Sequence, residues 1–383
     1  MESIVAAAGG APRPGERHVP ELDGVRALAI LSVMAAHLLV VTPALTHAAS
    51  GLPRALARVV DHGWLGVDLF FVLSGFLITS ILLAAKGGGA PAYFGRFYER
   101  RALRILPLLA LLLPVLAIAY VPLTGPAYFV LCALFAANLA PLLHVAVPNG
   151  GGPLWSLAVE EQFYLIWPVL VLLLDRRKLV LVLLAVVAIE PVLRALGLGE
   201  LEFTWLRCDG LAWGALLALW FSSPRRTRAG DDRLALALLG SAAALVLASI
   251  PFGGLHAGYV SSALRIPEAL CVFAALVVVG ISHSGAPALA LLRVPFAVVT
   301  ADFSYCLYLI HVPLIDAYQT VVGRYLPALP AALGPLGNNL VRATVVLVVA
   351  YALAALSRRY VELPFLTLGR RRTQLRRPST SSG

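Results

Sequence analysis

Two polar side chains, Arg26 and His37, lie in the first long apolar stretch of the sequence. They are eleven positions apart, which places both on one helix face, about 16 Å apart along the axis. An imidazole with a pKa near neutral can remove a proton from a hydroxyl group, so His37 is a candidate general base. The alternatives are a hydrogen-bonded packing role for His37 and an anchor at a membrane surface for Arg26.

Further polar side chains lie inside other apolar stretches, where an unpaired charge is costly. These residues are Asp68, Glu160, Arg207, Asp209, Tyr308 and His311. A carboxylate can orient an imidazole and stabilise its protonated form, which makes Glu160 and Asp68 candidates for that role. Arg207, Asp209, Tyr308 and His311 are candidates for the acceptor side of a site or for structural roles. For Arg207 and Asp209 the simpler interpretation is an internal ion pair.

A basic cluster precedes the third apolar stretch, in the segment RFYERRALRILP. Arg100 and Arg104 are four positions apart and share a helix face, a geometry that suits phosphate binding, and Arg101 lies between them. Orientation of the chain in a membrane is the alternative role for these arginines.

Other kinds of catalytic site have no support in the sequence. The cysteines Cys132, Cys208, Cys271 and Cys306 each stand alone in an apolar run, and no histidine pair has a ligand spacing such as HxxxH, so no metal site is expected. No GxSxG motif or glycine-rich nucleotide loop is present, which disfavours a serine acyl-enzyme or an ATP-driven reaction. The residues indicate a buried general base and a separate anion site, and they do not name a substrate.

The elements that must position these residues follow from the composition. Of 383 residues, 60% are hydrophobic and 13% are charged, and the mean hydropathy is +0.86. A soluble protein of this size could not bury so much apolar surface. The net charge of +10 comes from arginines between apolar runs, which is typical of membrane orientation rather than nucleic-acid binding. We therefore expect an all-α polytopic membrane helix bundle.

Eleven apolar stretches are near the length that crosses a bilayer as helix. They cover about 25–42, 64–85, 105–121, 127–147, 154–174, 179–196, 203–221, 234–252, 261–281, 296–320 and 340–357. The basic connections should all be cytoplasmic, which predicts about ten crossings and one stretch that does not cross, with 127–147 as the candidate. Ser74 and Gly75 are expected to allow close helix packing.

The chain divides into three predicted parts: a cytoplasmic N-terminal tail (1–20), a membrane domain (21–366) and a basic cytoplasmic C-terminal tail (367–383). Both termini are expected inside, and the first apolar run is expected to be a retained span because it carries Arg26 and His37. In this topology Arg26 and the loop arginines lie at the cytoplasmic face. The acids and histidines at depth, including His37 and Glu160, lie in the outer half of the membrane.

Six ordered motifs carry a family resemblance. They are ELDGVRALAILSVMAAH, GVDLFFVLSGFLI, FYERRALRILP, WSLAVEEQFYLIWP, FSYCLYLIHVP and VELPF. They cover about residues 20–366 and resemble the membrane acyltransferase-3 family. The resemblance implies that Arg26 and His37 are the family's functional pair, that Arg101 and Arg104, with Arg100 adjacent, form its arginine motif, and that Glu160 is the glutamate of its WSL motif. The extracytoplasmic hydrolase-like domain found fused in that family is not expected here.

The resemblance implies an O-acyltransferase of the plasma membrane. It would move an acyl group, most simply acetyl, from cytoplasmic acyl-CoA to a hydroxyl of a cell-surface glycan, a glycolipid or a glycosylated small molecule such as a macrolide. Acyl-CoA would be a co-substrate; no permanently bound cofactor and no nucleic-acid partner are expected. The alternative from another class is a transporter or exporter of an amphiphile, for which internal repeats would be expected.

Overall fold

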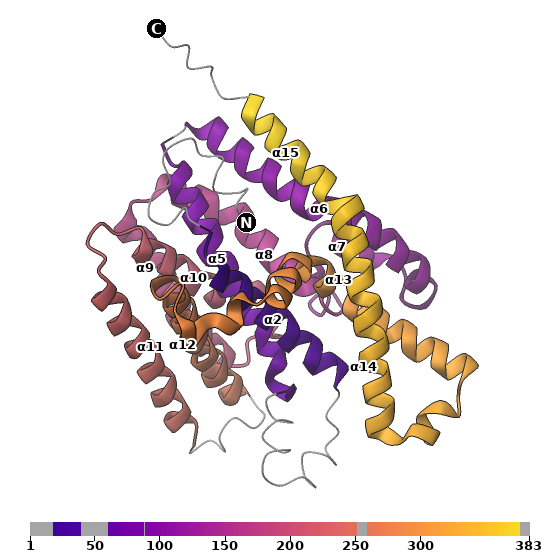
Figure 1. The fold of residues 1–383 in the computed structure, drawn as a ribbon. Helices are drawn as coiled ribbons and strands as arrows, with labels where there is room; N and C mark the ends of the chain where they lie inside the picture. The colour runs from indigo at the N-terminus through magenta and orange to yellow at the C-terminus, as the bar shows by residue number, and fades with distance from the viewer. Residues whose placement is uncertain (1–17, 40–59, 88, 251–258, 376–383) are drawn as a thin grey trace.

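A computed structural model of the chain describes residues 18–39, 60–87, 89–250 and 259–375. In these ranges the chain forms helices and no β-strand (Figure 1). The α-helices are α2 (Pro20–Leu38), α5 (Gly66–Ala85), α6 (Ala90–Thr124), α7 (Ala127–Ala133), α8 (Leu154–Leu173), α9 (Arg176–Ala195), α10 (Cys208–Phe221), α11 (Arg228–Ser249), α12 (Tyr259–Ser282), α13 (Pro295–Tyr325), α14 (Leu329–Ser357) and α15 (Leu363–Leu375). Residues 1–17 and 376–383, which belong to the two predicted tails, lie outside the described residues.

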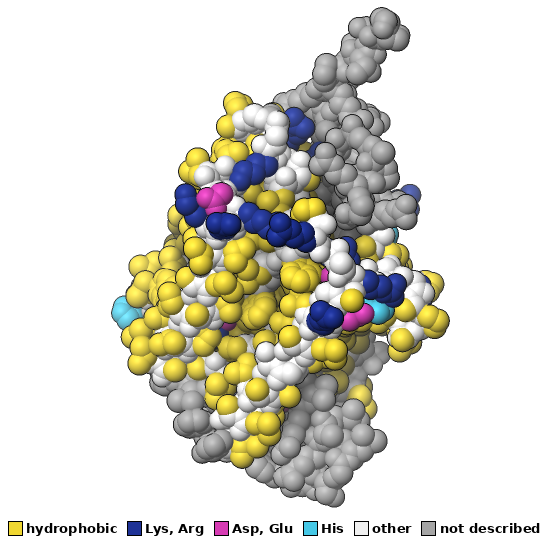
Figure 2. All heavy atoms as spheres, turned by 90° about the vertical axis from the view of Figure 1, so that its left-hand side faces the viewer, with side chains coloured by type: hydrophobic (Ala, Val, Ile, Leu, Met, Phe, Trp, Pro, Cys, Tyr) yellow, Lys and Arg dark blue, Asp and Glu magenta, His cyan; other side chains and the backbone are white. Residues whose placement is uncertain are grey.

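The surface of the bundle is apolar in the manner of a membrane protein. Within the described ranges, seven helices are long and apolar enough to cross a bilayer: α5, α6, α8, α11, α12, α13 and α14. On α6, Leu111, Val115 and Ile118 form an outward stripe and are 55%, 58% and 81% exposed. Figure 2 shows apolar side chains over most of one face and a band of Lys and Arg across its upper part. The expected all-helical membrane bundle is therefore confirmed, whereas the count of about ten crossings stays a prediction.

Several predicted stretches differ from the helices that form. α2 carries Glu21, Asp23 and Arg26, α9 has charged residues at both ends, and α10 has only 14 residues, so none of the three reaches the length and apolarity of the other spans. The stretch 127–147 contains the seven-residue α7, the 3-10 helix Ala137–Leu139 and turns, and Phe135 and His144 adopt positive φ angles there. At the other end, α15 continues to Leu375, past the predicted boundary at 366.

Three helices set the frame of the polar interior. α2 and α13 run in the same direction, because Ala27 packs with Ala297 and Ala301 while His37 meets His311 further along both helices. α5 runs against α2, and Gly66 lies at their contact, where a Cβ would be 2.4 Å from the carbonyl oxygen of Ala29. Figure 1 shows α2 in the middle of the bundle, with α5 and α13 beside it.

Close glycine contacts join α5 to α10. A Cβ on Gly75 would lie 2.0 Å from the carbonyl oxygen of Leu211, and one on Gly214 would lie 2.0 Å from that of Val72. Because only glycine allows this approach, the two helices pack backbone to backbone. The prediction of close packing at Gly75 is confirmed, whereas the hydroxyl of the adjacent Ser74 binds Glu160.

Candidate active site

Two histidines meet where the C-terminal end of α2 contacts the middle of α13. His311 Nε2 lies 3.3 Å from His37 Nδ1, and the ring centroids are 5.1 Å apart. The side chain of His311 is fully buried, whereas that of His37 is exposed at the surface of the bundle. The two residues were predicted separately as site candidates, and the parallel packing of their helices brings them into contact.

The hydrogen bonds around the two rings assign the protons of their neutral forms. His37 Nδ1 lies 2.9 Å from the carbonyl oxygen of Val33, which only accepts, so Nδ1 carries the proton. His311 Nδ1 faces the carbonyl oxygens of Tyr308 and Leu307, at 2.7 and 3.1 Å, and is protonated for the same reason. His311 Nε2 then accepts from His37 Nδ1. Nε2 of His37 is therefore an unprotonated base, and no group in the described ranges bonds to it.

A pair of hydroxyl groups lies beside the histidines. The Tyr308 hydroxyl is 2.6 Å from Ser156 Oγ, which α8 supplies, and the Tyr308 ring is 5.8 Å from that of His311. Ser156 Oγ also lies 3.2 Å from the carbonyl oxygen of Pro153, and when it donates its one proton there, Tyr308 donates to Ser156. When Ser156 donates to Tyr308 instead, the Tyr308 proton can turn toward another acceptor. Ser156 was not among the predicted site residues, although it lies inside the WSL segment that drew attention to Glu160.

Glu160 lies away from the histidine it was expected to orient. Its carboxylate accepts a hydrogen bond from Ser74 at 2.7 Å and one from Tyr164 at 3.3 Å. Ser74 is in the middle of α5, whereas His37 is at the end of α2 and bonds to Val33 and His311. The role predicted for Glu160 is corrected accordingly: it belongs with the arginines described below.

Asp68 forms an ion pair with Arg207 and was also expected to orient His37. Both of its carboxylate oxygens lie 3.0 Å from Nη2 of Arg207, and the two side chains are 0% and 2% exposed. The Arg207 guanidinium also lies 5.2 Å from the ring centroid of Trp155, and the rings of Trp64 and Phe71 are close by. Asp68 thus neutralises a buried cation, which leaves it unable to orient an imidazole.

Asp209 pairs with Arg194 of α9 rather than with Arg207, which corrects the expected Arg207–Asp209 ion pair. Arg194 also lies 3.7 Å from Glu190 and donates to the carbonyl oxygen of Leu206. Glu190 accepts from the backbone N–H groups of Cys208 and Asp209 at 3.1 and 2.9 Å, at the first turn of α10. This carboxylate stabilises the N-terminus of the helix, as its position in the helix dipole favours.

A cluster of arginines surrounds Glu160. Arg26 of α2 lies 3.7 Å from Asp23 and within electrostatic range of Glu160 and Arg101. The Arg101 guanidinium is 5.1 Å from the ring centroid of Tyr164, and the charges of Arg101 and Arg104 both act on Glu160. We call Arg26, Arg101 and Arg104 the arginine cluster; the helices α2, α6 and α8 hold it around one carboxylate.

Carboxylates lie around the arginine cluster, but two of its members are not held by them at close range: Glu161 acts on Arg101, and Glu362 on Arg104, only from a longer distance. In the described part of the chain, neither Arg101 nor Arg104 has a carboxylate oxygen within 4 Å. Arg104 is within range of Glu362 but also of Arg26 and Arg101, which repel it. Arg100 was predicted as part of the same anion site, and the charges that act on it are those of Arg96 and Glu99. The site that remains suits an anionic ligand.

The helical bundle has an apolar exterior, and its interior holds arginines, a carboxylate and histidines. These features define a membrane protein with an internal polar site. The family model described as an acyltransferase domain matches residues 19–359. The chain therefore belongs to the acyltransferase-3 family, which places it among the acyltransferase enzymes and confirms the resemblance in the sequence motifs.

Relatives of this chain are named as O-acetyltransferases. The peptidoglycan O-acetyltransferase OatA of Listeria monocytogenes is 32% identical over 247 residues, which are 60% of this chain and 34% of the relative. YrhL of Bacillus subtilis, provisionally named a peptidoglycan O-acetyltransferase, is 37% identical over 40% of this chain and 23% of its own length. A provisionally named O-acetyltransferase of Staphylococcus aureus strain COL is 31% identical over 41% of this chain and 25% of its own.

The chain spans about a third of the length of OatA and about a quarter of the other two. No solved structure is similar to it at a significant level.

Proposed function

We propose that this protein is a plasma-membrane O-acetyltransferase that moves an acetyl group from cytoplasmic acetyl-CoA to a hydroxyl of a glycan. The observation that carries the proposal is the arrangement along α2. One end of this helix holds an imidazole with an unprotonated, accessible Nε2, and the other belongs to the arginine cluster, in which Arg101 and Arg104 have no close carboxylate partner within the described ranges. A proton acceptor and an anion site are what acyl transfer from a coenzyme A thioester to an alcohol needs.

The arginine cluster is the proposed donor site. Three guanidinium groups surround Glu160, which Ser74 and Tyr164 already hold by hydrogen bonds. Phosphates of the donor would receive charge-assisted hydrogen bonds from Arg101 and Arg104, which have no close carboxylate partner among the described residues. The basic segments 86–104 and 358–377 favour a cytoplasmic position for this end of the bundle, where acetyl-CoA is available.

His37 is the proposed general base. Its Nε2 takes the proton of the acceptor hydroxyl as the oxygen attacks the thioester carbonyl carbon, and the imidazolium that forms keeps Nδ1–H on Val33 and His311. The C–O bond forms, the C–S bond breaks, and the proton passes to the leaving thiolate of coenzyme A. Tyr308 is the candidate donor to the oxyanion of the intermediate, since its hydroxyl proton is available to another acceptor when Ser156 donates to it.

The two ends of the site are about 16 Å apart along α2, from the rise of the helix. The thioester must therefore reach His37 on the extended arm of the coenzyme while its phosphates stay on the arginines. A covalent route is the rival: Nε2 of His37 would attack the thioester, carry the acetyl group and pass it to the acceptor. Both routes need the same free nitrogen.

The proposed acceptor is a glycan because the names of OatA and YrhL specify peptidoglycan. A glycolipid or a glycosylated small molecule such as a macrolide carries the same reacting group, a sugar hydroxyl. The acceptor hydroxyl approaches His37 from the outer half of the membrane in the topology expected from the basic loops.

The test is transfer of labelled acetyl from acetyl-CoA in membranes that contain the chain, with detection of acetyl esters in the envelope glycan by mass spectrometry. His37→Asn should lower the rate by about 10²- to 10⁴-fold, because general-base catalysis is lost. His144→Asn is the matched control, since His144 is exposed in the turns after α7. Normal transfer by a folded His37→Asn protein would refute the base assignment. Movement of a solute without gain of acetyl mass would instead support an exporter.

A further inference from the structure

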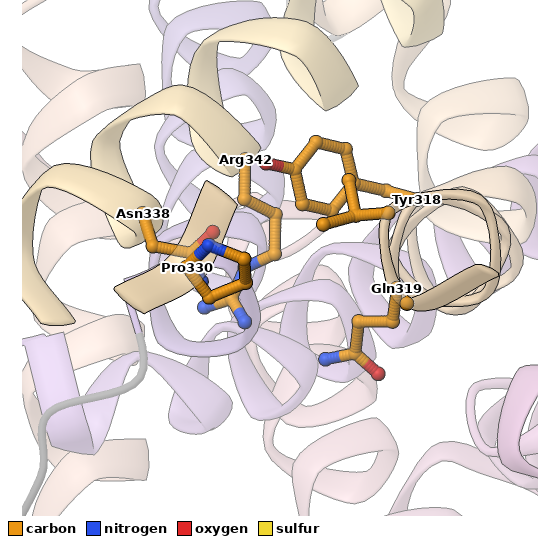
Figure 3. A pocket seen from close by; sticks show the side chains of 7 residues that line it. Tyr318, Gln319, Pro330, Asn338 and Arg342 are labelled. Carbon is orange, nitrogen blue, oxygen red and sulfur yellow. The ribbon is translucent and has the colours of Figure 1, made fainter. Parts of the chain in front are cut away.

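A second polar site lies between α13 and α14, apart from the donor cluster. The C-terminal half of α13 and the N-terminal half of α14 enclose a cavity of about 160 Å³ (Figure 3). Tyr318 and Gln319 line it from α13, and Pro330, Asn338 and Arg342 line it from α14. Figure 3 shows the Arg342 side chain between the ring of Tyr318 and the side chains of Pro330 and Asn338.

Three polar atoms in the lining are buried without a hydrogen-bond partner in the described residues. They are the Tyr318 hydroxyl, Asn338 Oδ1 and Arg342 Nε. A buried polar atom without a partner is costly and uncommon, so water or a ligand in the cavity must complete these three atoms.

Arg342 is the best fixed of the three residues. Its side chain is buried, with the residue only 6% exposed, and Nη2 donates to the carbonyl oxygen of Leu38 at 2.8 Å and to Asn339 Oδ1 at 3.0 Å. These bonds hold the guanidinium while Nε stays available. Because Leu38 directly follows His37, Arg342 also ties a wall of the cavity to the end of α2 that carries the proposed base.

We propose that this cavity binds a sugar ring of the acceptor, a proposal that rests on the proposed glycan acceptor. A sugar hydroxyl both donates and accepts, so it satisfies the Asn338 oxygen as well as the Arg342 N–H and the Tyr318 hydroxyl. Phosphate and carboxylate groups only accept, and they would leave the Asn338 oxygen facing another acceptor. A cavity of about 150 Å³ holds a benzene molecule, so the volume is of the order needed for one six-membered ring.

In this proposal the acceptor is bound and oriented by residues at the outer end of the site. The cavity holds one ring of the glycan through its hydroxyl groups, and the Arg342–Leu38 bond sets that ring relative to α2. A neighbouring hydroxyl of the same glycan then reaches His37. Residues of α13 and α14 would thus select the acceptor, whereas the arginine cluster selects the donor.

Equilibrium dialysis of the purified full chain with a radiolabelled N-acetylglucosamine tetrasaccharide tests the proposal without requiring catalysis. Tyr318→Phe and Asn338→Ser should each raise the Kd of the tetrasaccharide about threefold to tenfold, the effect of losing one hydrogen bond. Tyr325→Phe is the matched control, since Tyr325 is exposed on the same helix and lies outside the cavity. Thermal unfolding of each variant verifies that it is folded.

Absence of saccharide binding by the wild-type chain would overturn the proposal, as would equal binding by the folded Tyr318→Phe and Asn338→Ser variants. Displacement of the tetrasaccharide by millimolar inorganic phosphate would also overturn it, because the cavity would then be an anion site. Saccharide binding that depends on Tyr318 and Asn338, in a chain that transfers no acetyl group, would support the cavity and refute the proposed function.

Discussion

Two groups of arginines lie inside the helix bundle, and they are partnered in different ways. Arg194 and Arg207 are fully buried and each forms a close ion pair, Arg194 with Asp209 and Arg207 with Asp68. The arginine cluster of Arg26, Arg101 and Arg104 instead surrounds Glu160, which is already bound to Ser74 and Tyr164. The first group is held in close ion pairs, whereas Arg101 and Arg104 of the second group have no carboxylate oxygen within 4 Å among the described residues.

This difference in pairing distinguishes arginines that stabilise the fold from arginines that can bind a ligand. A matched buried ion pair neutralises both charges and fixes the helices that carry them. An arginine without a close carboxylate partner can still form charge-assisted hydrogen bonds to a bound anion. We expect changes in the first group to affect folding and changes in the second to affect the use of acetyl-CoA.

The largest effect is expected from Asp68→Asn. This change leaves the Arg207 cation buried without its carboxylate, which should cost about 3–5 kcal/mol in the free energy of unfolding. The thermal unfolding midpoint in detergent measures the loss. Asp175→Asn is the control, because Asp175 is exposed and asparagine also caps the start of α9. An unchanged midpoint in Asp68→Asn would show that the ion pair does not stabilise the bundle.

Arg104→Gln should have a smaller and different effect. If Arg104 binds the donor as proposed, the change removes a charge-assisted contact, so the KM for acetyl-CoA should rise about 10- to 100-fold while the unfolding midpoint stays within a few degrees. Arg177→Gln is the control, since Arg177 is an exposed arginine at the start of α9. A clear loss of stability with an unchanged KM would show that Arg104 has a structural role, and would contradict the distinction between the two groups of arginines.

The double variant Asp68→Val with Arg207→Met tests whether the buried ion pair itself is needed for stability. It removes both charges and fills the space with apolar side chains, so stability should return to within about 2 kcal/mol of the wild type. The unfolding midpoints of the single and double variants measure the recovery. A double variant as unstable as Asp68→Asn would mean that the ion pair specifies the packing of α5 and α10.

The smallest effect is expected from Tyr308→Phe at the histidine end. Loss of one hydroxyl donor should lower kcat about threefold to tenfold, with little change in the KM for acetyl-CoA. Steady-state transfer rates measure this split, and Tyr360→Phe, at an exposed tyrosine, is the control. A rise in KM without a fall in kcat would assign Tyr308 to acceptor binding rather than to the oxyanion.

Much of the fold could be predicted because the signals are local. The runs of apolar residues predict helices of membrane length, and the charged first turn of α2 and the breaks around 127–147 mark where the structure departs from that pattern. The close approach at Gly75 was also predictable, since a glycine in an apolar helix favours tight packing. The number of crossings depends on a membrane outside the chain and stays a prediction.

Less of the site could be predicted, because partners between helices leave no spacing in the sequence. Glu160 and Asp68 were expected to orient His37, yet each is bound elsewhere, Glu160 by Ser74 and Asp68 by Arg207. Ser156 and Arg342 were not predicted, although Ser156 lies in a motif and Arg342 lies in an apolar run, where an arginine is itself a signal.

The sequence by itself determined that the chain is a helical membrane protein, and that Arg26 and His37 share one helix face about 16 Å apart, because helix geometry fixes relations within a segment. Only the tertiary structure decided which charges are paired and which stay available. It also decided that His311 holds the Nδ1 proton of His37 and leaves Nε2 free. These relations join residues up to 274 positions apart, and they depend on how helices pack against each other rather than on their order in the chain.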